Sequence, residues 1–284
     1  MLIHKLSQEF VNRIILRSGL QEQLSEDGNY RFHYFDDQSD RPPIVLLNGF
    51  GISTEFQWYK MLGTLSRKYR VVLVNLLHFG KSTTIGKAAY SNAEQVDFLQ
   101  HLTRRLGLTS YKIAGISYGG LIAAELAELR PEAIRELILI DSPVKFLTIE
   151  SLEQMCQSFG VETIKEFFAP ATAKGLQKQI KAAYKNPPFV PTFVLSGFHK
   201  ALCQPYLVAW EALIDKLLEE YEQLRAREYR FDGPVKLIWG KHDRIVPLEV
   251  GQQLAQLYPN SQLIEVDAGH IPTIETPAKL RHIL

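Results

Sequence analysis

The sequence is poor in cysteine, carries almost no net charge and lacks a long apolar run. Its two cysteines, Cys156 and Cys203, fall in no metal-ligand or redox spacing, and two lone thiols suit a reducing compartment as well as a single disulfide. The formal net charge of +1 provides no overall field that would recruit nucleic acid or an anionic membrane. Because no apolar run reaches about 18 residues, no transmembrane helix is expected.

The rest of the composition is ordinary for a globular protein. Apolar residues make up 46% of the 284 positions and charged residues 22%, a length that allows one large core or two modest domains. The start lacks the continuous apolar segment of a secretory signal, so we expect a cytoplasmic protein. Residues 1–28 instead predict an amphipathic helix, with Leu2, Leu6, Phe10 and Ile14 at helical spacing. We expect it to pack on the domain or on the cap described below; the alternative is a helix that rests on a membrane surface.

Short apolar runs alternate with helical patterns over the first half of the chain. The runs lie at 43–48, 69–75, 111–115 and 137–141. Ser91 can cap a helix whose apolar face holds Val96, Leu99 and Leu102. Strands and helices that alternate in this way predict a parallel sheet covered on both faces. Residues 30–35 alternate polar and apolar side chains and predict an antiparallel edge strand.

A helical block interrupts this alternation. Strand-like runs resume only at 235–240 and 263–266, with a helix at 248–257 between them. The sequence therefore predicts one α/β core, residues 29–143 and 233–284, with a helical cap inserted at 144–232. The final helix is expected to be short or to continue beyond Leu284. The block also contains aromatic side chains, which could form an apolar lid or pack cap against core: Phe146, Phe159, Phe167, Phe168, Phe189, Phe193, Phe198, Tyr206 and Trp210.

The segment Gly115-Ile116-Ser117-Tyr118-Gly119 is the strongest candidate for chemistry. It matches G-x-S-x-G at the end of an apolar strand and the start of a helix, which is the setting of a nucleophile elbow. A strained turn there projects the serine hydroxyl, and glycines at 115 and 119 avoid a collision with it. The alternative is an ordinary glycine-rich turn between a strand and a helix.

A serine hydroxyl needs a base, and the base needs an orienting acid. His270, in Ala268-Gly269-His270-Ile271-Pro272, directly follows the last expected strand, where a parallel sheet gathers its functional groups. Asp243 follows the strand at 235–240 and gives the chain order serine, aspartate, histidine. Asp141, at the end of the run at 137–141, is the rival acid. We favour Asp243 because its order and spacing suit a triad better.

Several further motifs occur in a fixed order along almost the whole chain. They are Asn48-Gly49-Phe50-Gly51, Phe79-Gly80-Lys81-Ser82, Gly115 to Gly120, Arg130-Pro131-Glu132, Trp239-Gly240-Lys241-His242-Asp243 and Gly269-His270-Ile271-Pro272 with Glu275 and Pro277. With these motifs the sequence resembles the capped α/β-hydrolase superfamily, in its serine hydrolase and esterase branch. The resemblance implies a mostly parallel, eight-stranded type of sheet flanked by helices. It also implies an oxyanion hole from the amides of Phe50 and Tyr118, each typically worth about 10²–10³ in rate.

The sequence departs from the family pattern in two loops. Asn48 stands where the family usually has histidine, and Asn75 and His78 stand where it usually has aspartate and glycine. Asn48 can still donate and accept hydrogen bonds, so we expect a shifted oxyanion loop that is still present. The conformation of the loop after residue 75 is left open.

These features predict a carboxylic ester hydrolase that forms an acyl-enzyme on Ser117 and needs no metal or organic cofactor. The expected partner is a small to medium apolar ester, and no nucleic acid. A carbon–carbon bond hydrolase or a thioesterase with the same triad is the alternative within enzymes, and a ligand-binding protein that lost turnover is the alternative outside them. Lys174, Lys178, Lys181 and Lys185 fall at helical spacing and are expected to form a solvated face; the alternative is a basic stripe that attracts anionic substrates or a membrane surface. The oligomeric state is left open.

Overall fold

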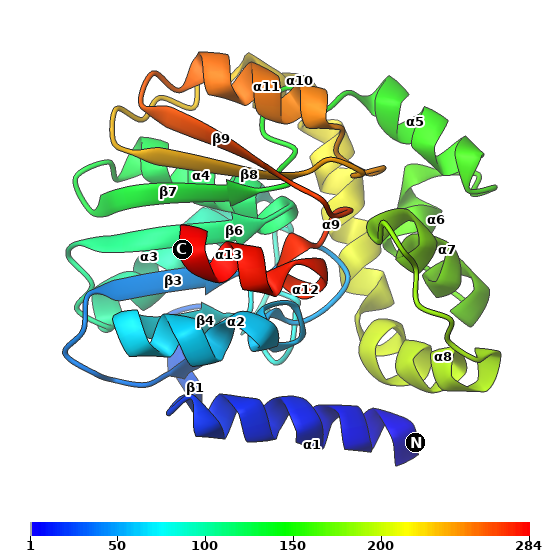
Figure 1. The fold of residues 1–284 in the computed structure, drawn as a ribbon, viewed down its shortest axis with the longest axis horizontal. Coiled ribbons are helices and arrows are strands. Elements are labelled where there is room, and N and C mark those ends of the chain that lie inside the picture. Colours follow the sequence, from blue (N-terminus) through cyan, green and yellow to red (C-terminus); the bar gives the residue numbers. More distant parts are fainter. Residues whose placement is uncertain (1) are drawn as a thin grey trace.

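A twisted β-sheet forms the centre of the molecule (Figure 1). The computed structural model describes residues 2–284, with side chains from residue 7 onward. In this part the strands follow the order β1-β2-β4-β3-β6-β7-β8-β9, and β5 pairs with β2. Strand β2 runs antiparallel to β1, β4 and β5, and the remaining pairs are parallel. The strands are β1 Gln21–Asp27, β2 Tyr30–Asp36, β3 Pro43–Leu47, β4 Arg70–Val74, β5 Thr83–Thr84, β6 Tyr111–Ile116, β7 Ile134–Ile140, β8 Val235–Gly240 and β9 Ser261–Val266.

Helices cover both faces of the sheet and divide the apolar core into two layers. One layer contains side chains of α1, α2 and α13, and the other contains those of α3, α4 and α11. Buried runs such as Ile44–Leu47 serve both layers, which explains why these strands are apolar without alternation. The helices of these layers are α1 Leu2–Arg17, α2 Thr54–Lys68, α3 Asn92–Arg105, α4 Tyr118–Leu129, α11 Leu248–Leu257, α12 Pro272–Glu275 and α13 Pro277–Ile283.

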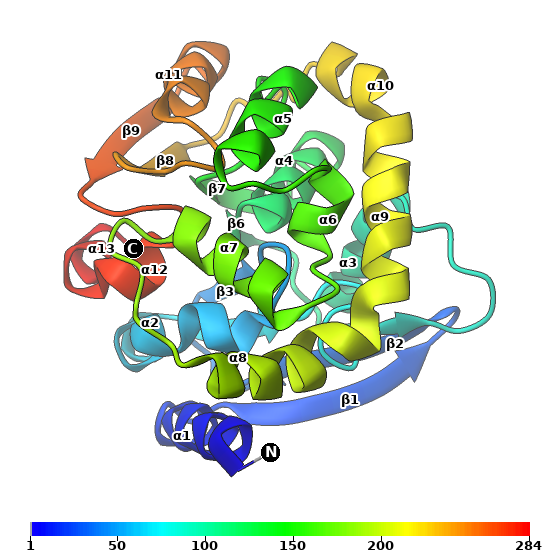
Figure 2. The ribbon, with the colours of Figure 1, turned by 90° about the vertical axis from the view of Figure 1, so that its right-hand side faces the viewer.

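The remaining helices lie between β7 and β8 in the chain and across the carboxyl ends of the parallel strands (Figure 2). They fall inside residues 144–232, the segment that we propose as the cap. This segment also contributes to the apolar core. Its Trp210 and Leu213 are buried in the same layer as the side chains of α4. The elements are α5 Ile149–Ser158, α6 Ile164–Phe168, α7 Ala173–Ala183, α8 Thr192–Phe198, a π-helical turn η1 His199–Cys203, a 3₁₀ turn η2 Gln204–Tyr206, α9 Leu207–Glu219 and α10 Tyr221–Ala226.

The strand order opens a crevice between the loops that follow β3 and β6. From β3 the chain passes to β4 on one side, and later returns to β6 on the other side of β3. The loops that follow β3 and β6 therefore separate at their carboxyl ends and leave a crevice, which is where open α/β sheets bind ligands. The loop after β3 carries Asn48 to Gly51, and the loop after β6 carries Ser117.

The prediction for the N-terminal segment was wrong in two respects. The helix α1 ends at Arg17, and residues 21–27 form β1 instead of continuing the helix. The buried face of α1 contains Val11 and Ile15, whereas Phe10 is 56% exposed. Leu2 and Leu6 have side chains outside the described set. The helix packs on the domain beside α2, as expected.

The capped helix at residue 91 is confirmed. Ser91 Oγ accepts a hydrogen bond from Glu94 N at 3.2 Å, and Leu99 and Leu102 are buried. Both cysteines are free and buried, and burial raises the pKa of Cys156 to about 11 and that of Cys203 to about 12. Among the described residues, no helix combines the length and apolar character that a membrane crossing requires.

Candidate active site

Ser117 lies in the sharp turn between β6 and α4. Its φ of 51° and ψ of −120° place a non-glycine residue in a strained conformation. The turn is tight enough to require glycine on both sides, because a Cβ at Gly115 would lie 2.2 Å from Gly119 O and one at Gly119 would lie 2.4 Å from Asn48 O. The geometry is that of a nucleophile elbow.

His270 and Asp243 form a hydrogen-bonded pair. Nδ1 of His270 lies 2.7 Å from Oδ2 of Asp243, and both side chains are buried. The other carboxylate oxygen, Oδ1, accepts hydrogen bonds from the backbone amides of Ile245 (2.8 Å) and Val246 (3.0 Å). These amides fix the carboxylate, which in turn places the proton on Nδ1 and leaves Nε2 free to accept one.

Asp141, the rival acid, lies at the end of β7 and is fully buried. Its Oδ1 accepts a hydrogen bond from Gly240 N at 2.8 Å, and its Oδ2 contacts no hydrogen-bond donor in the described part of the chain. Burial, followed by the neighbouring Asp243 carboxylate, raises the pKa of Asp141 well above its ordinary value. The raised pKa favours the neutral form of the Asp141 carboxyl, and no hydrogen bond joins Asp141 to His270.

The loop after β3 presents a free amide next to Ser117. Within residues 2–284, Phe50 N has no hydrogen-bond acceptor. Tyr118 N is the first amide of α4, a position with no acceptor inside a helix. Gly49 holds the two loops close, because a Cβ there would lie 3.2 Å from Ser117 Cβ. Phe50 thus has an unbonded amide in the loop beside Ser117, and Tyr118 has one directly after the serine in the chain.

The departures from the family pattern each make defined contacts. Asn48 accepts a hydrogen bond from Leu76 N at 3.0 Å and donates one to Gly49 O at 3.0 Å. Asn75 accepts one from Thr54 N at 2.8 Å. His78 has a φ of 69°, the conformation that glycine adopts most easily, and Trp210 Nε1 donates to its carbonyl oxygen at 3.1 Å. The loop after β4 is therefore ordered and bonded to α9 of the cap segment.

Two apolar pockets meet at Ser117. One extends beneath α5, α6 and α9 and is lined by residues that include Leu121, Leu152 and Ile214. The other extends beneath α7 and α8 and is lined by residues that include His270, Leu195 and Ile274. Phe50, Ser117 and Phe168 line both. A bound molecule could thus place apolar groups on both sides of a carbonyl at Ser117.

The aromatic residues of the helical block divide between packing and lining. Phe168 and Phe198 line pockets that contain Ser117, whereas Phe167 and Trp210 are buried in the core. Phe189 and Phe193 are exposed. The indole of Trp210 stacks on Phe79, with 5.7 Å between ring centroids, and so joins this segment to the core.

The predicted basic face does not form one continuous stripe on a helix. Its members are Lys174, Lys178, Lys181 and Lys185. The helix α7 ends at Ala183, so Lys185 lies beyond it, where its Nζ pairs with Asp267 at 2.6 Å. Lys178 donates to the carbonyl oxygen of Gly160. None of the four lysines lines either pocket at Ser117. In the described part of the chain, no group of three or more His, Cys, Asp or Glu side chains is arranged to hold a metal ion.

Sequence reasoning missed residues that hold the site from outside it. Gln57, one turn into α2, accepts a hydrogen bond from Gly49 N at 2.7 Å. Glu275 accepts hydrogen bonds from Gly269 N at 2.7 Å and from Lys185 N at 3.1 Å, and so joins the His270 loop to the chain after α7. Glu275 belongs to the stretch after His270 that resembles the family, but the sequence alone assigned it no role.

The sequence profile described as "alpha/beta hydrolase fold" matches residues 42–277. The chain belongs to this family. Lipase 3 of Moraxella sp. (strain TA144) is 25% identical over 248 residues, which cover 82% of this chain and 73% of that lipase. The 2-hydroxymuconate semialdehyde hydrolase of Pseudomonas sp. (strain CF600) is 24% identical over 282 residues, which cover 96% and 92%.

Solved structures show the same α/β-hydrolase fold. The 2-hydroxy-6-oxo-6-phenylhexa-2,4-dienoate hydrolase of Rhodococcus sp. strain RHA1 superposes with a TM-score of 0.79 at 20% identity, covering 93% of this chain and 96% of that one. The relatives are lipases, esterases and carbon–carbon bond hydrolases. They support a hydrolase of this fold and differ in the bond that they cleave.

Proposed function

We propose that this protein hydrolyses carboxylic esters of small to medium apolar substrates through an acyl-enzyme on Ser117. The observation that carries the proposal is the convergence of Ser117, on its strained turn, and of the Asp243-bonded His270 on one apolar pocket. These are the parts that activate a serine towards a carbonyl carbon.

In the first half of the reaction, Ser117 Oγ attacks the carbonyl carbon and His270 Nε2 takes the hydroxyl proton. Asp243 stabilises the imidazolium that forms. The negative oxygen of the tetrahedral intermediate lies between the amides of Phe50 and Tyr118. His270 then gives its proton to the departing alcohol oxygen, the ester C–O bond breaks, and the acyl group remains on Ser117.

In the second half, water replaces the alcohol. His270 takes a proton from the water, whose oxygen attacks the acyl carbon, and a second oxyanion forms between the same two amides. The bond to Ser117 Oγ breaks as His270 returns the proton to that oxygen. The products are the carboxylic acid and the free enzyme.

The linings of the two pockets support an apolar ester in preference to an anionic substrate. Lys145 and Arg225 line the pocket beneath α5 and α9, but both cations are engaged. Lys145 Nζ donates to Arg227 O at 2.6 Å, and the Arg225 guanidinium lies 5.5 Å from the centre of the Tyr221 ring. A carboxylated substrate would have to compete with these contacts, although the ammonium and the guanidinium both keep further N–H donors.

Carbon–carbon bond hydrolysis is the second candidate, because relatives with this activity match most of the chain. The same triad could cleave a carbon–carbon bond or a thioester. Lys145 and Arg225 are then the cations that would grip a carboxylated enol. A ligand-binding protein without turnover is the third candidate, and it predicts tight binding without product.

A substrate panel separates these candidates. Purified protein and Ser117→Ala are assayed with p-nitrophenyl esters of two to twelve carbons, matched acyl-CoA thioesters and a dienoate carbon–carbon substrate. We expect highest kcat/KM on the apolar esters, and loss of that activity in Ser117→Ala. Preference for the dienoate, with weak ester cleavage, would contradict the ester assignment. Absence of turnover on every substrate would favour the ligand-binding alternative.

A further inference from the structure

The amide of Phe50 belongs to a peptide unit whose carbonyl oxygen, Gly49 O, accepts hydrogen bonds from two side chains. Gly49 O and Phe50 N lie in one planar peptide. Asn48 Nδ2 donates to Gly49 O at 3.0 Å, and Gln57 Nε2 donates to it at 3.3 Å. Gln57 Oε1 also accepts from Gly49 N at 2.7 Å. These side chains therefore fix the direction in which Phe50 N–H points.

The side chain of Asn75 is linked to both Gln57 and Asn48 through Thr54. Asn75 Oδ1 accepts a hydrogen bond from Thr54 N at 2.8 Å, at the start of α2, and Gln57 lies one turn further along this helix. Thr54 Oγ1 contacts both asparagines, at 3.2 Å from Asn75 Oδ1 and 3.0 Å from Asn48 Oδ1. Asn75 is buried, with no exposed side-chain surface. It thus connects β4 to both sides of the oxyanion loop.

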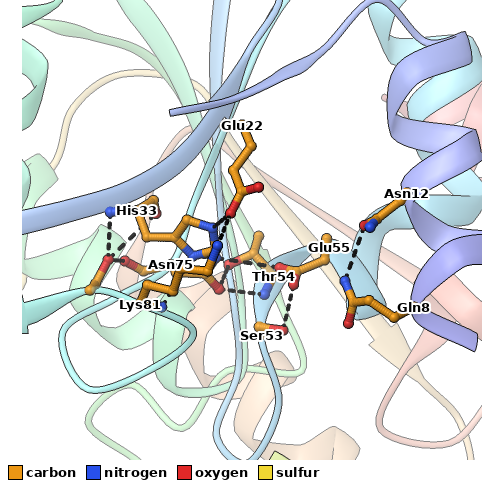
Figure 3. Close-up of polar contacts among 10 residues, drawn as sticks. Gln8, Asn12, Glu22, His33, Ser53, Thr54, Glu55, Asn75 and Lys81 are labelled. Carbon is orange, nitrogen blue, oxygen red and sulfur yellow. Dashed lines mark hydrogen bonds and ion pairs between the residues drawn. The ribbon is translucent and has the colours of Figure 1, made fainter. Parts of the chain in front are cut away.

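The other end of the Asn75 amide is held by His33 (Figure 3). Asn75 Nδ2 lies 2.9 Å from His33 Nδ1 and 3.3 Å from Glu55 Oε2. Lys81 N, a backbone donor, also lies 3.2 Å from His33 Nδ1, so this nitrogen must be the acceptor. The proton of the ring then sits on Nε2, 3.0 Å from Glu22 Oε1.

Two backbone amides remove any ambiguity in this arrangement. Thr54 N requires an oxygen at Asn75 Oδ1, and Lys81 N requires a lone pair at His33 Nδ1. If the Asn75 amide flipped, its NH₂ group would face Thr54 N, donor against donor. Burial lowers the pKa of His33, against the raising effects of Glu55 and Glu22, which keeps the ring neutral and Nδ1 available.

Position 80, next to the contact between His33 and Asn75, has no room for a side chain. A Cβ at Gly80 would lie 2.7 Å from His33 Nδ1 and 2.9 Å from Asn75 Cγ. Gly80 belongs to the Phe79-Gly80-Lys81-Ser82 motif. That glycine therefore permits the approach of the Lys81 backbone to His33.

We propose that Asn75 is a positioning residue for the oxyanion hole, which acts through Thr54, Gln57 and Asn48 on the Phe50 amide and is itself held in orientation by His33. The proposal rests on the proposed function, because the Phe50 amide matters only if an oxyanion forms at Ser117. It assigns a role to the asparagine that replaces the family's usual aspartate. An aspartate could not donate to His33 Nδ1 and would place its charge beside Glu55.

The test is Asn75→Leu, which keeps the approximate shape of the side chain and removes its polar atoms. With a short apolar p-nitrophenyl ester we expect kcat to fall about tenfold, part of the loss from removing one oxyanion donor outright, and KM to stay within about twofold. The inhibition constant of an alkyl trifluoromethyl ketone, which forms an oxyanion on the serine, should rise about tenfold in parallel. A residue that only supports the fold would not weaken this inhibitor selectively.

Control variants separate positioning from stability. Val72 lies in β4, three residues before Asn75, is fully buried and makes no polar side-chain contact, so Val72→Ala should lower the melting temperature without changing kcat more than about twofold. His33→Asn keeps an acceptor near the position of Nδ1 and should retain kcat within about threefold. His33→Leu removes the acceptor and should show the Asn75→Leu kinetics, which keeps the proposal testable if Asn75→Leu does not fold.

Three outcomes decide the matter. Parallel losses in kcat and ketone affinity, in Asn75→Leu or His33→Leu but in neither control, support the positioning role. Unchanged kcat in folded Asn75→Leu, with an active wild type, overturns it and leaves the proposed function intact. A wild type that neither cleaves the ester nor binds the ketone overturns both.

Discussion

Replacement of Asp243 by asparagine should nearly abolish turnover without disturbing the fold. Oδ1 of Asp243 accepts hydrogen bonds from two backbone amides, at 2.8 and 3.0 Å. An asparagine oxygen must occupy that position, because an NH₂ group there would face two donors. The NH₂ group then points at His270 Nδ1, where the carboxylate oxygen lies 2.7 Å away in the wild type.

The consequence is the wrong tautomer of His270. Nδ1 must then accept a hydrogen bond, so the proton moves to Nε2, which can no longer take a proton from Ser117. The same change in a serine protease lowers kcat about 10⁴-fold, or roughly 5 kcal/mol of transition-state stabilisation. We expect a loss of this order in Asp243→Asn, with the melting temperature changed by only a few degrees.

Asp141→Asn is the matched control, since it makes the same chemical change in the neighbouring buried carboxyl. Burial raises the pKa of Asp141 and so favours its uncharged form, which asparagine mimics while it keeps the acceptor for Gly240 N. We expect kcat within about threefold of the wild type. The assay is steady-state hydrolysis of a p-nitrophenyl ester with both variants at equal folded concentration. If Asp243→Asn retained more than a tenth of the activity, or if Asp141→Asn were the dead variant, the assignment of the acid would be refuted.

Three further predictions concern stability and the turn at the serine. The pKa of Asp141 is raised in the folded state, so the folded state keeps a proton that the unfolded state releases above about pH 4. In urea titrations the wild type should therefore lose stability relative to Asp141→Asn as the pH rises from about 4 towards neutrality. A stability difference that is independent of pH would contradict this. Gly119→Ala would place a Cβ 2.4 Å from Asn48 O, so we expect a lower melting temperature and no fluorophosphonate labelling; full labelling would show that the turn tolerates a side chain. Arg227→Met removes the cation that bonds buried Glu125 at 2.7 Å; we expect a loss of about 1.5–3 kcal/mol in the free energy of unfolding, and a loss below about 0.5 kcal/mol would count against this pairing.

Much of the fold could be predicted because its signals are local. Runs such as 43–47 and 71–74 are apolar throughout, since both of their faces are covered by helices. The candidate triad followed from chain order, because each of its residues comes directly after a parallel strand and such loops gather at one edge of the sheet. The resemblance to α/β-hydrolases rested on these same loops.

The features that were missed depend on contacts between distant segments. The strand β1 consists mostly of polar, exposed residues at the edge of the sheet, so it lacks the alternation that identifies a half-buried strand. The face of α1 was misassigned because apolar side chains occur all round it; Phe10 and Leu16 are exposed while Val11 and Ile15 are buried. The contact between His33 and Asn75 joins residues 42 positions apart, and no spacing rule predicts such a pair.

The most direct test of the account is the site and rate of covalent labelling by a fluorophosphonate. The wild type should gain one phosphonyl group by intact-mass spectrometry, with the adduct on the peptide that contains Ser117. Ser117→Ala should gain none, and His270→Ala should react at least about 100-fold more slowly because the hydroxyl then lacks its base. Folded wild-type protein that stays unlabelled, or an adduct on another residue, would contradict the claim that Ser117 is an activated nucleophile.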